Sequence, residues 1–121
     1  MLDDVAGSDR REAVGALQSA IGKSEKSLAR MAEKGASTAL VAKRLKALRT
    51  GLDMLEHAWD HAPHRYTRGD LEEARGVLAG LLPSVEAIYA RSKPGTPQRT
   101  LLERRVRALN LALKAIDADP R

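Results

Sequence analysis

The sequence predicts an all-α protein, an antiparallel four-helix bundle built from two duplicated αα-hairpins. When the chain is shifted by 61 positions, 13 of the 47 residues from 9 to 55 meet an identical residue. Apolar residues recur at heptad spacing in four segments, and Gly or Pro interrupts each hairpin midway. A repeat of this length indicates a supersecondary unit that stacks on a copy of itself. Heptad spacing predicts left-handed packing with helix crossings near ~20°.

The first predicted hairpin spans residues 9–59, with helices over 9–33 and 37–59 on either side of Gly35. Its second helix has apolar residues at alternating steps of four and three, which places them on one face. This stripe consists of Val41, Leu45, Leu48, Leu52, Leu55 and Trp59. We expect Trp59 to close one end of the bundle.

The second predicted hairpin spans residues 68–118, with helices over 68–92 and 97–118. Thr67 and Asp70 have the spacing of a capping box, and Thr96 precedes a proline at the first helical position. Pro83 lies inside the third helix, where the missing N–H predicts a kink.

Length and composition predict a single domain over residues 1–121, with a flexible N-terminus at 1–8 and a linker at 60–67 between the hairpins. The chain has no cysteine, which excludes disulfides, thiolate metal sites and a cysteine nucleophile. The acidic start and the absence of a long apolar run predict a cytoplasmic protein that does not enter a membrane. Abundant Arg and Ala suggest a GC-rich bacterial genome.

No nucleophile elbow, phosphate loop, dinucleotide fingerprint or metalloprotease motif occurs. We therefore predict a small non-enzymatic protein without a cofactor, acting as a protein–protein interaction or regulatory module. Three leucines fall outside the heptad stripes and are candidates for an apolar interface with a partner or a second copy in a homodimer. They are Leu40, Leu101 and Leu111. The alternative is that loops or neighbouring helices cover them.

The net charge of +5 is concentrated in the second helix of each hairpin. Such a repeated basic segment predicts either solvated helix faces or a surface for RNA, DNA or another polyanion. The candidate residues are Lys43, Arg44, Lys46, Arg49, Arg104, Arg105 and Arg107. Since only three aromatic residues are present, nucleic-acid binding would depend on phosphate contacts rather than base stacking.

All three histidines lie at the junction between the hairpins. His57 and His61 are one helical turn apart, and His64 follows Pro63 in the linker. This spacing suits zinc or nickel, with a nearby carboxylate as a further ligand. The alternative is a surface cluster of histidines without a metal.

Overall fold

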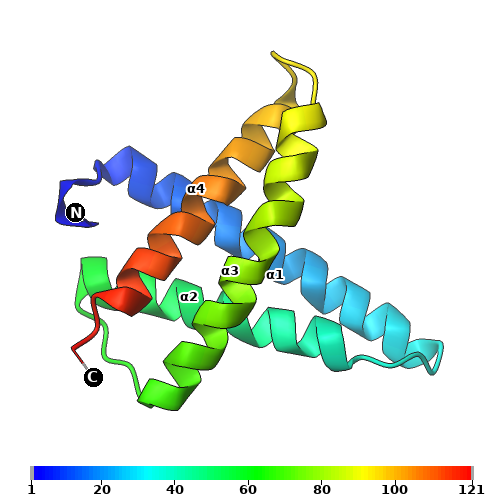
Figure 1. Cartoon of the computed structure of the whole chain (residues 1–121), viewed down its shortest axis with the longest axis horizontal. Helices are drawn as coiled ribbons and strands as arrows, with labels where there is room; N and C mark the ends of the chain where they lie inside the picture. The colour runs from blue at the N-terminus through cyan, green and yellow to red at the C-terminus, as the bar shows by residue number, and fades with distance from the viewer. Residues whose placement is uncertain (1, 121) are drawn as a thin grey trace.

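The computed structural model describes residues 2–120 and places four α-helices there (Figure 1). They are α1 (Gly7–Glu33), α2 (Ala39–Asp60), α3 (Arg68–Arg91) and α4 (Pro97–Asp117), preceded by a 3₁₀ turn, η1 (Leu2–Asp4). No β-strand occurs in residues 2–120. The prediction of an all-α four-helix bundle is confirmed.

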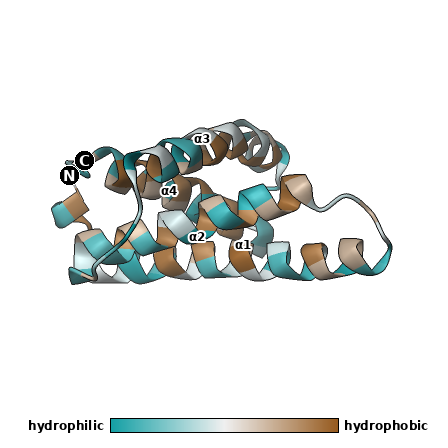
Figure 2. Cartoon of the chain, turned by 90° about the horizontal axis from the view of Figure 1, so that it is seen from below, coloured by the Kyte–Doolittle hydropathy of each residue, from teal (hydrophilic) through white to brown (hydrophobic). Residues whose placement is uncertain are grey.

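The two hairpins form two layers that cross each other (Figures 1 and 2). Helices α2 and α4 are central, because each contacts all three other helices. Helices α1 and α3 contact both central helices but not each other over the described residues. The internal duplication and the handedness of the packing stay predictions.

Core residues from both hairpins meet where the hairpins cross. Leu17 of α1 and Leu78 of α3 are fully buried, and these residues are 61 positions apart in the sequence. Gly51 of α2 also lies at this crossing. A Cβ atom added to Gly51 would lie 3.1 Å from Cβ of Ala112 and 3.2 Å from Cδ1 of Leu78. Because Ala112 lies 61 positions after Gly51, matched positions of the two hairpins meet at the centre of the fold.

The helix ends follow the local sequence signals. The Oγ1 atom of Thr67 accepts from the N–H of Asp70, whose carboxylate accepts from the N–H of Thr67, as a capping box requires. Thr96 caps α4 by accepting from the N–H of Arg99. Gly35 and Gly95 adopt positive φ angles of 70° and 78° in the hairpin loops, a conformation that favours glycine. Helix α3 continues through Pro83 without a break, and a bend of its axis there stays a prediction.

The start of the chain packs against the end of α2. The indole N–H of Trp59 donates to the carbonyl of Leu2 at 3.1 Å, and Trp59 is 9% exposed. Leu2 and Val5 pack against the core, while the guanidinium of Arg10 lies 5.4 Å from the centre of the Trp59 ring. Flexibility of residues 2–8 stays a prediction. The ends of the predicted domain, Met1 and Arg121, lie outside the described residues.

Each hairpin continues past the crossing, so its loop end projects from the molecule (Figure 1). Over residues 2–120, none of the helices combines the length and hydropathy needed to cross a bilayer.

Candidate functional sites

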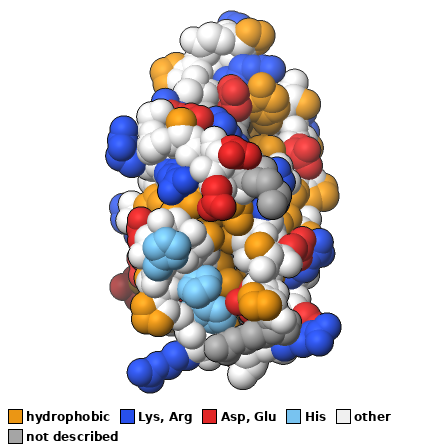
Figure 3. Space-filling model, turned by 90° about the vertical axis from the view of Figure 1, so that its left-hand side faces the viewer, with side chains coloured by type: hydrophobic (Ala, Val, Ile, Leu, Met, Phe, Trp, Pro, Cys, Tyr) orange, Lys and Arg blue, Asp and Glu red, His pale blue; other side chains and the backbone are white. Residues whose placement is uncertain are grey.

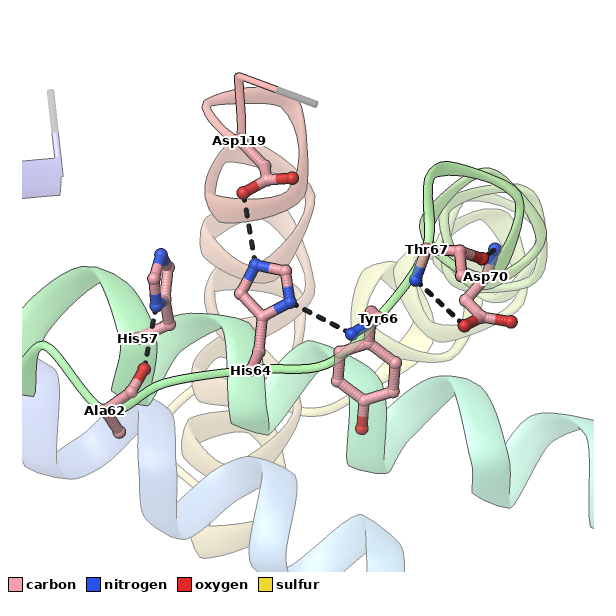
Figure 4. Close-up of polar contacts among 7 residues, drawn as sticks. All are labelled: His57, Ala62, His64, Tyr66, Thr67, Asp70 and Asp119. Carbon is pink, nitrogen blue, oxygen red and sulfur yellow. Dashed lines mark hydrogen bonds and ion pairs between the residues drawn. The ribbon is translucent and has the colours of Figure 1, made fainter.

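The junction between the hairpins brings two of the three histidines together with a carboxylate (Figure 4). His57 lies near the end of α2, His64 in the linker and Asp119 just after α4. One potential ligand atom from each residue lies within 4.8 Å of the others. The side chains of His64 and Asp119 are each only 4% exposed. Histidine side chains gather on the face shown in Figure 3.

When the imidazoles of His57 and His64 are neutral, their hydrogen bonds fix the tautomers. Nδ1 of His57 donates to the carbonyl of Ala62 at 2.7 Å, because a carbonyl can only accept. Its Nε2 is therefore left as an acceptor. Nδ1 of His64 accepts from the N–H of Tyr66 at 3.1 Å, so Nε2 of His64 has the proton and donates to Oδ1 of Asp119, also at 3.1 Å.

Asp119 was not a predicted site residue, whereas His61 was. His61 ends α2 in the left-handed conformation, with φ 59°, and its side chain is exposed. The group of three potential metal ligands found in residues 2–120 consists of His57, His64 and Asp119, and does not include His61. The three predicted histidines therefore do not form one close group in residues 2–120, and the chain turns at His61.

The linker also borders an open hollow of about 560 Å³, whose lining includes His64. Its lining includes the carboxylates of Asp53, Glu56 and Asp70. The hydroxyl of Tyr66 donates to Asp53 there. Burial of the phenol raises the pKa of Tyr66, and Asp53 raises it further. The linker is thus held to α2 by two hydrogen bonds, one at His57 and one at Asp53.

The basic residues of α4 are used within the molecule. Arg107 forms an ion pair with Asp9 of α1 at 3.1 Å, and Arg104 lies 3.6 Å from Glu12 of the same helix. Arg105 is half-buried, and its Nε and Nη2 atoms are buried without a hydrogen-bond partner. Burial lowers the pKa of Arg105.

The basic residues of α2 repeat part of this pattern. Lys43 and Lys46 line one hollow together with Asp70 and Glu73 of α3. Each of these four residues lies 61 positions from one of the four residues that pair between α1 and α4. Those four are Arg104, Arg107, Asp9 and Glu12. Arg44 is exposed, and Arg49 forms an ion pair with Glu25 at 2.6 Å. Much of the predicted basic surface thus faces acidic residues of the opposite hairpin or of its own.

The three candidate leucines lie in different environments. Leu40 is 59% exposed at the start of α2, Leu101 is half-buried, and Leu111 is 7% exposed within the core. Leu111 is therefore not a surface residue, in contrast to its predicted role at an interface. Because α4 contacts three helices, its buried face is wider than a heptad seam and includes Leu111.

Comparisons with protein-family models, with curated proteins and with solved structures find no match to this chain. The class that its fold defines is an all-α four-helix bundle.

Proposed function

We propose that the chain is a non-enzymatic binding module that recognises an acidic protein partner with the loop end of its first hairpin. We call residues 20–44 the basic end. Six Lys or Arg residues and two Glu residues give this segment a net charge of +4, compared with +3 for the matched segment 81–105 of the second hairpin. The exposure of all six cations beside the exposed Leu40 at a projecting end is the observation that carries the proposal.

The cations of the basic end are available to a partner. All six are exposed: Lys23, Lys26, Arg30, Lys34, Lys43 and Arg44. One of the two acids, Glu25, already pairs with Arg49. No ion pair within the described residues involves any of the six cations, although Lys43 borders the hollow with Asp70 and Glu73.

Apolar side chains accompany these charges. Leu40 is 59% exposed, and Leu28, Met31 and Val41 are only half-buried, because the second hairpin does not cover this end (Figure 1). The ribbon is hydrophobic at the start of α2 in Figure 2. An apolar contact surrounded by charges is typical of a protein interface, in which buried contacts supply affinity and peripheral charges supply specificity.

The charge argues against a second copy as the occupant of this surface. Two basic ends brought together would place +4 against +4, and like charges in contact are strongly unfavourable. An acidic surface with an apolar contact for Leu40 fits better.

Nucleic acid is the second candidate, because the same charge surplus suits a phosphate backbone. Phosphate binding uses the cations but not Leu40. The two candidates are therefore distinguished by separate substitution of charges and of leucine.

The test compares variants of the full-length protein. We expect Lys26→Glu, Arg30→Glu and Lys34→Glu together to weaken binding to a purified acidic partner by tenfold or more. That partner would first be recovered by affinity capture with the wild type. The control variant Arg11→Glu, Arg91→Glu and Lys93→Glu changes the net charge equally at exposed sites elsewhere and should bind normally.

Leu40→Ser should weaken the same complex by about tenfold, whereas Ile88→Ser, at the 42% exposed apolar residue of α3, should not. Fluorescence anisotropy with labelled RNA and duplex DNA at about 50 and 300 mM salt tests the second candidate. Salt-sensitive binding that is lost in the charge variant but kept in Leu40→Ser would replace a protein partner with nucleic acid. Equal effects of the charge variant and its control would contradict both.

A further inference from the structure

The cluster of His57, His64 and Asp119 contains a buried carboxylate oxygen without a partner. Oδ1 of Asp119 accepts from His64, but Oδ2 is buried and has no hydrogen bond. A buried ionised oxygen without a donor is costly, and most such groups in proteins are paired with a proton donor or bind a cation.

His57 presents a second acceptor to the same cluster. Its Nδ1–H donates to the carbonyl of Ala62, which leaves Nε2 with a free lone pair. In Figure 4 this nitrogen lies on the side of the ring away from Ala62, toward the end of the chain that carries Asp119. Metal-binding histidines commonly have this arrangement, in which one ring N–H donates to a backbone carbonyl and the other nitrogen binds the metal.

We propose that His57, His64 and Asp119 bind a divalent transition-metal ion, with zinc the best match. Two imidazole nitrogens and a carboxylate oxygen are ligands that zinc accepts, and three protein ligands leave one tetrahedral position for water or another ligand. The ligand atoms lie within 4.8 Å of one another, so small side-chain movements would bring them around one ion.

Metal binding requires a tautomer change at His64. Nε2 of His64 now has the proton that it donates to Asp119, while Nδ1 accepts from the N–H of Tyr66. Coordination through Nε2 needs the tautomer with the proton on Nδ1. A protonated Nδ1 cannot accept a hydrogen bond from the N–H of Tyr66. The bond between Tyr66 and His64 must therefore break when the metal binds.

The ion would join three parts of the chain: the last turn of α2, the linker and the second residue after the end of α4. These parts belong to both hairpins, so metal binding should stabilise their junction. Because a metal that binds the folded state adds to stability by mass action, the melting temperature should rise with zinc concentration.

The test uses the full-length protein without a histidine tag, stripped of metal, in calorimetric titrations with zinc chloride. We expect one zinc per chain and a higher melting temperature. His57→Ala and Asp119→Asn should each weaken binding by at least tenfold. His61→Ala is the matched control, because His61 is exposed and outside the cluster, and it should bind as the wild type does.

Nuclear magnetic resonance gives a second measurement that does not depend on variants. Zinc should shift the backbone amide resonance of Tyr66, because its hydrogen bond to His64 is lost. The proposal is overturned if the wild type binds no zinc, if His61→Ala weakens binding as much as His57→Ala, or if zinc binds without changing the Tyr66 amide.

Discussion

Gly51 shows how one residue limits the approach of the two hairpins. Its position would place a Cβ atom 3.1 Å from Cβ of Ala112, a methyl group fixed to the backbone of α4. Interiors packed at crystal-like density have little room for such an addition. A small residue is thus needed at this point of α2, although glycine is a poor helix former.

We expect Gly51→Val to lower the free energy of unfolding by about 1–3 kcal/mol, because the added side chain overpacks the crossing. Urea denaturation followed by circular dichroism measures the change. The control is Gly15→Val on α1, where an added Cβ would have no atom within 4 Å. There we expect no loss, since valine forms helix slightly better than glycine. Equal losses at both sites would contradict the close approach at Gly51.

The cap of α3 predicts a pH dependence. The backbone N–H of Thr67 donates to the carboxylate of Asp70 and holds the pKa of that carboxyl below its ordinary value, and the Thr67 side chain acts in the same direction. A lowered pKa in the folded state stabilises the protein above the unfolded-state pKa, and this contribution is lost as the pH falls through the folded-state pKa.

We therefore expect Asp70→Asn to be less stable than the wild type at neutral pH, with the difference shrinking below about pH 4. Denaturant unfolding of both proteins at several pH values checks this. A constant difference at all pH values would show that the charge of Asp70 does not contribute. Thr67→Ala removes the hydroxyl of the same cap and should cost about 1 kcal/mol.

At the scale of helices, the contact between hairpins has a charged border on each side of the core. Cations of α4 pair with acids of α1. At the matched positions, 61 residues earlier for the cations and 61 residues later for the acids, cations of α2 lie beside acids of α3. Lys46 contributes to lowering the pKa of Asp70, as a cation near a carboxylate does. Each border is partly exposed, so each pair contributes little to stability.

A double-mutant cycle of Asp9→Ala and Arg107→Ala measures one such pair. The two side chains are 32% and 54% exposed, so we expect a coupling energy of about 0.2–1 kcal/mol. The coupling should shrink toward zero in about 1 M salt, where charges are screened within a few ångströms. Denaturation of the four proteins at low and high salt gives both values. A coupling that salt leaves unchanged would argue that the pair acts through packing.

Local sequence signals predicted the helices closely, because each helix is defined by its own periodicity and caps. The predicted helix of 97–118 is observed at Pro97–Asp117, and the capping residues Thr67 and Thr96 act as predicted. Heptad spacing identifies a buried face but not how the hairpins cross. For that reason the burial of Leu111 could not be predicted from the stripe alone.

The candidate site was predicted only in part, because it combines residues distant in sequence. His57 and His64 were expected to be neighbours, but Asp119 lies 55 residues after His64. One signal was available in the 61-residue offset: residue 118 lies 61 positions after residue 57, so a matched arrangement of the helices would place the chain end near the end of α2. The predicted linker of 60–67 already placed His61 outside the helix, whereas the one-turn spacing of His57 and His61 assumed that the helix continues.

At the scale of the molecule, neither hairpin buries its apolar face without the other. Leu17 and Leu78 are both fully buried at matched positions of the two hairpins, and both belong to one contiguous core. Such a shared core predicts that the hairpins unfold together, as small single domains usually do.

We expect Leu17→Ala and Leu78→Ala each to lower the free energy of unfolding by about 2–5 kcal/mol, the usual cost of a cavity in a core. The decisive measurement is the fluorescence of Trp59, the only tryptophan, which reports on the first hairpin, compared with circular dichroism, which reports on all helices. Leu78 lies in the second hairpin, so independent hairpins would leave the Trp59 transition unchanged in Leu78→Ala. A shared core requires both signals to shift equally to lower denaturant concentration, because removing support from one hairpin exposes the seam of the other.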